Sequence, residues 1–126
     1  MRVDRRELAA IFAGGLLGAL ARAGLAERLP PEPGGWPWAT FLANLAGAAL
    51  LGWAITRLQE RMPLTAYRRP LIGTGLCGAL TTFSTLQLEL LDLFDAGRGA
   101  LAAAYAAASL AAGFAVVWLA TGAARR

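Results

Sequence analysis

Four long stretches without a charged residue constrain this chain more than any other feature of its sequence. They are Leu8–Ala21, Trp36–Thr56, Leu71–Leu88 and Gly99–Ala124, and the last three are 21, 18 and 26 residues long. A helix needs about 20 consecutive apolar residues to span a bilayer core. Because 57% of the 126 residues are hydrophobic, little of the chain remains for a soluble domain. Continuous apolar runs also exclude membrane strands, in which apolar and polar residues alternate.

We therefore predict an all-α integral membrane protein, with residues 1–126 forming one transmembrane domain. The approximate spans are 8–28, 36–57, 70–92 and 99–122. The first stretch also has features of a signal peptide, because arginines precede its apolar run and the small residues Ala19 and Ala21 follow. However, the run is long and Arg22 would come directly after the cleavage site. We favour a membrane span.

The arginines predict the orientation of these spans. With four spans, both termini lie on the same side as the loop between the second and third spans. That side holds nine of the twelve basic residues: Arg2, Arg5, Arg6, Arg57, Arg61, Arg68, Arg69, Arg125 and Arg126. The positive-inside rule then places both termini of this multi-pass cell-membrane protein in the cytoplasm. Arginines in loops and tails fit membrane topology better than a nucleic-acid partner, so none is predicted.

The third stretch has an unusual composition for a membrane helix. Three glycines are followed by four hydroxyl residues, in the order Gly73, Gly75, Gly78, Thr81, Thr82, Ser84 and Thr85. We predict a break near Gly78–Thr81, which would free backbone carbonyls at membrane depth. Freed carbonyls suit a hard cation such as Na⁺. A kink whose hydroxyls bond to the preceding turn explains the same composition equally well.

Polar side chains continue beyond the predicted break. Thr82, Thr85 and Glu89 share one helix face, beside a stripe led by Phe83. The second span adds Asn44, and the fourth adds Tyr105 and Ser109 at a spacing of i, i+4. Intramembrane polar residues commonly mark an ion or substrate pathway. The alternatives are a solvated interfacial acid at Glu89 and a packing seam in the fourth span.

An anion crossing near these residues would meet only weak partners. No basic side chain other than Arg22 falls within a span away from its ends. The remaining partners are the Asn44 amide, the hydroxyls and the positive edge of the Phe83 ring. Weak, repeated contacts suit conduction, because a tight site would trap the ion.

Other functional classes fit the sequence less well. An enzyme is not predicted, because histidine is absent and the single cysteine, Cys77, has no evident base. A small multidrug-type transporter works around an acid in the middle of its first helix, whereas the first span here has none between Glu7 and Glu27. A purely structural membrane subunit gives no reason for Asn44 or the polar row.

Three segments together resemble the CrcB/Fluc family of fluoride channels. They are GGLLGALAR (14–22), TFLANLAGAALLG (40–52) and GLCGALTTFSTLQLE (75–89), and they occur in the family's order within a four-span chain of matching length. The resemblance implies a fluoride-specific channel for passive export of fluoride from the cytoplasm. It also implies an antiparallel dimer in the lipid bilayer, with fluoride pores along the interface and a structural Na⁺ between the broken helices.

The resemblance also implies roles for individual residues. The carbonyls of Gly78 and Thr81 would hold the Na⁺, and Arg22 matches the arginine that closes the first segment. The pore lining or its supports would comprise Asn44, Phe83, Ser84, Thr85, Leu86, Glu89, Tyr105 and Ser109.

Two features depart from the family pattern. The family usually has a second phenylalanine where this chain has Leu86, so one pore station is predicted to be altered. The nine-to-three arginine bias favours one orientation, whereas a self-paired antiparallel dimer requires both. Besides a dual-topology homodimer, the sequence therefore predicts a heterodimer with a paralogous chain, in which this subunit is non-conducting or conducts on one side only.

Overall fold

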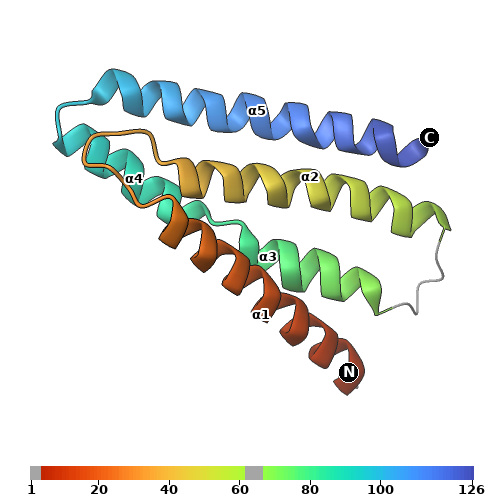
Figure 1. Cartoon of the computed structure of the whole chain (residues 1–126). Helices are drawn as coiled ribbons and strands as arrows, with labels where there is room; N and C mark the ends of the chain where they lie inside the picture. The colour runs from red at the N-terminus through yellow and green to blue at the C-terminus, as the bar shows by residue number, and fades with distance from the viewer. Residues whose placement is uncertain (1–3, 62–66) are drawn as a thin grey trace.

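The computed structural model describes residues 4–61 and 67–126, and these residues are helical apart from short connections. The elements are α1 (Arg5–Arg28), α2 (Trp38–Arg61), η1 (Pro70–Cys77), α3 (Gly78–Leu80), α4 (Phe83–Asp95) and α5 (Gly99–Arg125) (Figure 1). Four segments are long and apolar enough to cross a membrane: Arg5–Arg28, Trp38–Glu60, Pro70–Asp95 and Gly99–Arg125. The predicted all-α, four-span architecture is confirmed for the described residues.

The α2 helix lies between its neighbours. It packs against α5 on one side and against η1 and α3 on the other, while α1 packs mainly against η1 and α3. The start of α1, the ends of α2 and α5 and the start of η1 lie at the same end of the molecule (Figure 1). This arrangement places seven of the nine arginines discussed above near one end. Arg2 and the side chain of Arg61 lie outside the described residues.

Local sequence signals set the helix boundaries. Asp4 caps α1 by accepting a hydrogen bond from the Arg6 backbone N–H at 2.8 Å, and this bond holds the pKa of Asp4 below its usual value. After α1, the proline-rich segment 30–37 cannot continue a helix. Gly34 in this segment adopts a φ of 68°, which favours glycine. The α2 helix consequently begins at Trp38, two residues after the expected start of the second span.

The third span is interrupted, as the sequence predicts. Its first part, η1, is a π-helix that starts at Pro70, and the Gly78 N–H donates to the Gly73 carbonyl five residues earlier. Thr81 (φ −81°, ψ 152°) and Thr82 (φ −149°, ψ 125°) are then extended, and α4 restarts at Phe83. The break therefore lies at Thr81–Thr82, at the end of the predicted window. The π-helical geometry of η1 was not expected from its composition.

Glycines allow α1 to approach η1 closely. A Cβ at Gly14 would overlap the Leu71 carbonyl oxygen, and one at Gly18 would overlap the Leu76 carbonyl oxygen. From the other side, a Cβ at Gly75 would overlap the Ile11 carbonyl oxygen. These backbone-to-backbone contacts are the ones expected of small residues at a membrane-helix interface.

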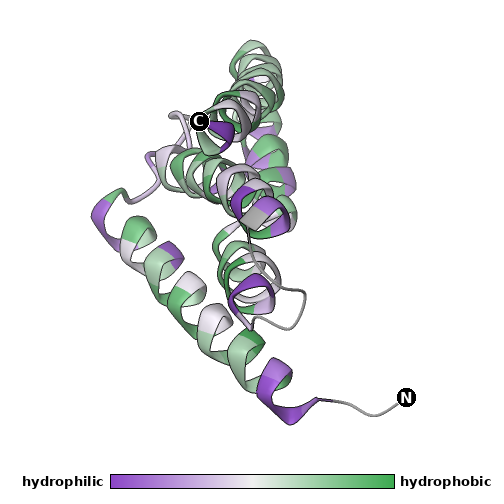
Figure 2. Cartoon of the chain, turned by 90° about the vertical axis from the view of Figure 1, so that its right-hand side faces the viewer, coloured by the Kyte–Doolittle hydropathy of each residue, from purple (hydrophilic) through white to green (hydrophobic). Residues whose placement is uncertain are grey.

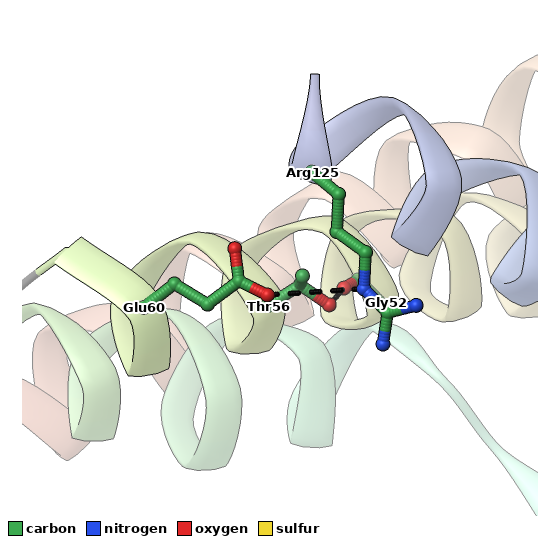
Figure 3. Close-up of polar contacts among 4 residues, drawn as sticks. All are labelled: Gly52, Thr56, Glu60 and Arg125. Carbon is green, nitrogen blue, oxygen red and sulfur yellow. Dashed lines mark hydrogen bonds and ion pairs between the residues drawn. The ribbon is translucent and has the colours of Figure 1, made fainter.

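The helices consist largely of hydrophobic residues along their lengths (Figure 2). Large side chains such as Phe12, Phe114 and Trp118 are at least 70% exposed, consistent with contact with lipid. One group of polar contacts lies near the ends of α2 and α5. Arg125 of α5 forms an ion pair with Glu60 of α2 at 3.7 Å. One turn before Glu60, the Thr56 hydroxyl donates to the Gly52 carbonyl (Figure 3).

Candidate functional site

Asn44 holds the break in the third span. Its Nδ2 donates to the Thr82 carbonyl at 3.0 Å, and the Thr82 N–H donates to its Oδ1 at 2.7 Å. The side-chain amide therefore bonds to both the N–H and the carbonyl of Thr82, as the backbone of a neighbouring strand would. The paired contact leaves one Nδ2 hydrogen of Asn44 for another acceptor. Asn44 thus both supports the break and retains a donor beside it.

The break leaves several backbone carbonyls without their helical donors, among them those of Gly78 and Thr81. The N–H of Thr82, which would close an α-helical bond to the Gly78 carbonyl, donates to Asn44 instead. The N–H of Thr85, which would close one to the Thr81 carbonyl, donates to the Thr82 hydroxyl at 3.2 Å. Within residues 4–61 and 67–126, no hydrogen bond to either carbonyl is found. Gly78 and Thr81 therefore offer neutral oxygen ligands, which fit an alkali cation such as Na⁺.

Hydroxyls gather at the start of α4. The Thr82 hydroxyl caps the helix, donates to the Thr85 hydroxyl at 3.0 Å and lies 3.4 Å from the Ser84 hydroxyl. Thr82 itself is extended rather than helical. The first residue of the predicted polar row is therefore the N-cap of α4, and only Thr85 and Glu89 lie within the helix. The short hydroxyl cluster starts next to the Asn44 amide, because both groups bond to Thr82.

Glu89 is held by hydroxyls from two other helices. Thr40 of α2 donates to its Oε1 at 2.6 Å, and Tyr105 of α5 donates to its Oε2 at 2.8 Å. Both carboxylate oxygens thus accept a hydrogen bond. The half-buried Glu89 is therefore not simply a solvated interfacial acid. Instead it links α4 to α2 and α5.

An aromatic cluster surrounds this link. Tyr105 is fully buried, and its ring lies 5.3 Å from that of Trp36 and 6.4 Å from that of Phe41. A cavity of about 230 Å³ lies beside the cluster, between segment 31–37 and α4, and Glu89 is among the residues that line it. Glu89, the last residue of the polar row, therefore lies close to the molecular surface beside segment 31–37.

Phe83 and Leu86 occupy different environments. Phe83 is 72% exposed in the single chain, at the membrane depth where the third span is broken. Leu86 is half-buried and packs against the core of Leu93, Ala102 and Tyr105. The aliphatic side chain at position 86 is thus part of the subunit interior, whereas the ring at position 83 is available to a second molecule.

The remaining predicted site residues are placed as follows. Arg22 donates from Nε to the Ala79 carbonyl at 3.1 Å, so it satisfies another carbonyl that the break leaves free. Ser109 lies one turn from Tyr105, but its buried hydroxyl has no partner among the described residues. The structure thus brings together Asn44, Thr81, Thr82 and Thr85 at the break and, one to two turns along α4, Tyr105 and Glu89.

Sequence reasoning missed Thr40 and the carbonyl bond of Arg22. Thr40 lies four residues before Asn44, on the same face of α2, so its position relative to Asn44 was a usable signal. The partner of Arg22 is a backbone carbonyl 57 residues away, and no side-chain pattern identifies such a partner.

Comparisons with known proteins identify the family of this chain. The family model described as "CrcB-like protein, Camphor Resistance (CrcB)" matches residues 9–121. The protein named "Fluoride-specific ion channel FluC 1" of Mycobacterium bovis is 57% identical over 123 residues, which are 98% of this chain and 93% of the relative. Its namesake in Streptomyces coelicolor is 40% identical over 125 residues, 99% of this chain and 81% of the relative. "Fluoride-specific ion channel FluC 2" of Nocardia farcinica is 41% identical over 123 residues, 98% and 88% of the two chains. The chain therefore belongs to the CrcB family.

Proposed function

We propose that this chain is a subunit of a fluoride-specific channel, which lets fluoride leave the cytoplasm passively. The observation that carries the proposal is the match over nearly the whole chain to relatives named fluoride-specific ion channels. The family assignment also favours a channel over the multidrug-type transporter. A passive channel requires no catalytic residue, and none is assigned.

The polar groups around α4 supply suitable contacts for a small, strongly accepting anion. The free Nδ2 hydrogen of Asn44 and the exposed hydroxyl of Ser84 are donors that carry no full charge. The exposed ring of Phe83 offers its positive edge. Each of these contacts is weaker than an arginine or lysine, so fluoride would be released as readily as it is bound.

Fluoride efflux from liposomes tests the proposal. Purified protein is reconstituted into vesicles loaded with potassium fluoride, and efflux is started with a potassium ionophore and followed with a fluoride electrode. We expect rapid fluoride efflux, no chloride efflux under the same conditions and loss of flux in Phe83→Ala. A well-folded protein that passes no fluoride either alone or together with its paralogous partner, or that passes chloride equally, would disprove a fluoride-specific channel.

We also propose that a structural Na⁺ binds at the break, held by the carbonyls of Gly78 and Thr81. Both oxygens lack helical donors, as described above, and two of them are too few to enclose a cation. A second subunit related by a two-fold axis would bring the number to four. The cation would neutralise the carbonyl dipoles at membrane depth and hold the two broken helices together. Thermal unfolding that depends on Na⁺ but not on choline would support this role.

Because one subunit supplies too few carbonyls to enclose a cation, the Na⁺ site requires a dimer. We propose that this dimer is antiparallel. The exposed Phe83 ring and the incomplete cation site both need a partner. The arginine bias favours a fixed orientation and hence a heterodimer with a paralogous chain over a homodimer. Reporter fusions at the C-terminus distinguish the two. A signal from the cytoplasm alone supports the heterodimer, whereas equal signals from both compartments contradict a fixed orientation.

A non-conducting or one-sided subunit is a second candidate. It is favoured by Leu86, which takes the place of a pore phenylalanine and packs against the subunit's own core. In that case the chain alone would conduct weakly, and addition of the paralogous partner would restore full fluoride flux. A fast, fluoride-selective flux from this chain by itself would contradict it.

A further inference from the structure

Next to Asn44 on α2, a second residue faces the break. Gly47 follows Asn44 at a spacing of i, i+3, so the two share a helix face. A Cβ added at Gly47 would overlap the Cγ2 methyl of Thr81 and lie 3.6 Å from its Cβ and 3.8 Å from Leu80 Cδ2. Gly47 is buried, and the space that it leaves is filled by the Thr81 methyl.

Glycine at this position is unfavourable for the helix itself. A mid-helix glycine lowers stability relative to alanine, and α2 has alanine at positions 43, 46, 48 and 49 around it. The close approach of Thr81 explains the exception, because alanine at 47 would occupy the volume of the methyl group.

Thr81 cannot easily move its methyl aside. Its hydroxyl donates to the Cys77 carbonyl at 2.8 Å, and its N–H donates to the same carbonyl at 3.0 Å. A β-branched side chain has few rotamers, and rotation about χ1 would break the hydroxyl contact. A side chain at position 47 would therefore push the Thr81 backbone rather than only its side chain.

We propose that Gly47 is a positioning residue for the cation site. By accommodating the Thr81 methyl, it lets Thr81 take the extended conformation that directs its carbonyl away from the helix. Asn44 meanwhile withholds the Thr82 N–H from the Gly78 carbonyl. One face of α2 thus controls the availability of both carbonyls. Asn44 acts on the Gly78 carbonyl through its side-chain amide, and Gly47 acts on the Thr81 carbonyl because it has no side chain. This inference rests on the proposed Na⁺ site and extends it to a residue that touches no ion.

A double-mutant cycle with the Thr81 methyl tests it. Gly47→Ala is made in the wild-type chain and in Thr81→Ser, which removes only Cγ2 and keeps the hydroxyl and the carbonyl. The detergent-solubilised dimer of each variant is titrated with NaCl, with choline chloride keeping the ionic strength constant. The thermal unfolding midpoint is followed, since a cation that binds only the folded state raises it. The quantity compared is the Na⁺ concentration that gives half of the full stabilisation.

We expect Gly47→Ala to raise this concentration about tenfold in the wild-type chain and about twofold or less in Thr81→Ser, the coupling typical of residues in direct contact. The matched control is Gly52→Ala on the same helix, where a Cβ would lie 3.2 Å from the Val117 carbonyl oxygen of α5. That variant should unfold at a lower temperature at every Na⁺ concentration, with the half-stabilising concentration unchanged. A general weakening of helix packing would make Gly47→Ala behave like Gly52→Ala.

The outcomes separate this inference from the proposals on which it rests. An unchanged Na⁺ concentration in Gly47→Ala, or the same shift on both backgrounds, would overturn the role of Gly47 and leave the Na⁺ site intact. A wild-type protein that responds equally to Na⁺ and choline would overturn the Na⁺ site and this role with it, while fluoride efflux still decides the channel. If Gly47→Ala does not fold, the double variant decides. Its recovery supports the proposal, and its failure to fold contradicts it.

Discussion

Asn44 and Thr82 exchange two hydrogen bonds, with N···O distances of 2.7 and 3.0 Å, although they lie 38 residues apart in the chain. Asn44→Asp keeps the shape of the side chain but points a carboxylate oxygen at the Thr82 carbonyl. We expect a loss of about 1–3 kcal/mol in the free energy of unfolding, because a half-buried donor–acceptor pair becomes two acceptors. Fluoride efflux should fall with it.

Gln87→Glu is the matched control for this change. It makes the same amide-to-carboxylate substitution on an exposed residue of α4. Denaturant unfolding of both variants in detergent checks the prediction. Wild-type stability in Asn44→Asp would mean that the paired contact does not hold the break.

The hydrogen bond from Tyr105 to Glu89 gives a second prediction. Tyr105→Phe removes one of the two hydroxyls that hold the carboxylate, and should lower the unfolding free energy by about 1.5–3 kcal/mol, the range for bonds to charged groups. Tyr67→Phe removes another tyrosine–carboxylate contact, the 3.2 Å bond to Asp4 at an exposed site, and should cost less than Tyr105→Phe. Equal losses in thermal unfolding would show that burial of the Glu89 contact adds nothing.

The glycines of α1 give a third prediction, because only some of them touch η1. A Cβ at Gly18 would overlap the Leu76 carbonyl oxygen, whereas one at Gly24 would have no neighbour within 4 Å. Gly18→Ala should therefore lower the thermal unfolding temperature. Gly24→Ala should raise stability by up to about 1 kcal/mol through its helix propensity. The interpretation of the α1–η1 contact is wrong if both variants behave alike.

Leu86→Phe tests the altered pore station. If the missing ring limits conduction, the variant should raise the fluoride efflux rate of the reconstituted chain. Leu88→Phe adds the same ring to α4 at a position that is 61% exposed, and should leave the rate unchanged. An unchanged rate in Leu86→Phe would count against an impaired pore, provided that its unfolding temperature shows the ring is accommodated beside Tyr105.

The four-span fold could be predicted because each span is a long uncharged run. Such a run can be identified from the sequence without knowing which residues it contacts in the fold. The break was also predictable, since glycines and hydroxyls at positions 78–85 weaken a membrane helix locally. Its location at Thr81–Thr82 was not, because Asn44 of another helix selects the residue that becomes extended. The π-helical turns of η1 likewise follow from no pattern in its composition.

The candidate site was predictable in its members more than in their contacts. Glu89 and Tyr105 both carry polar groups in apolar spans, which singles them out. The hydrogen bond between them depends on how α4 and α5 pack. Thr40 was overlooked because one threonine near the end of a span is common in membrane proteins. Its importance is seen only from the carboxylate that it contacts.

Thr40, Asn44 and Gly47 repeat at i, i+4 and i+7 along α2, so a single ridge of one helix determines both the interruption of the third span and the anchoring of its second half. A chimaera between related channels should therefore exchange α2 together with α3 and α4. Recombination between them would separate a template from the segment that it shapes.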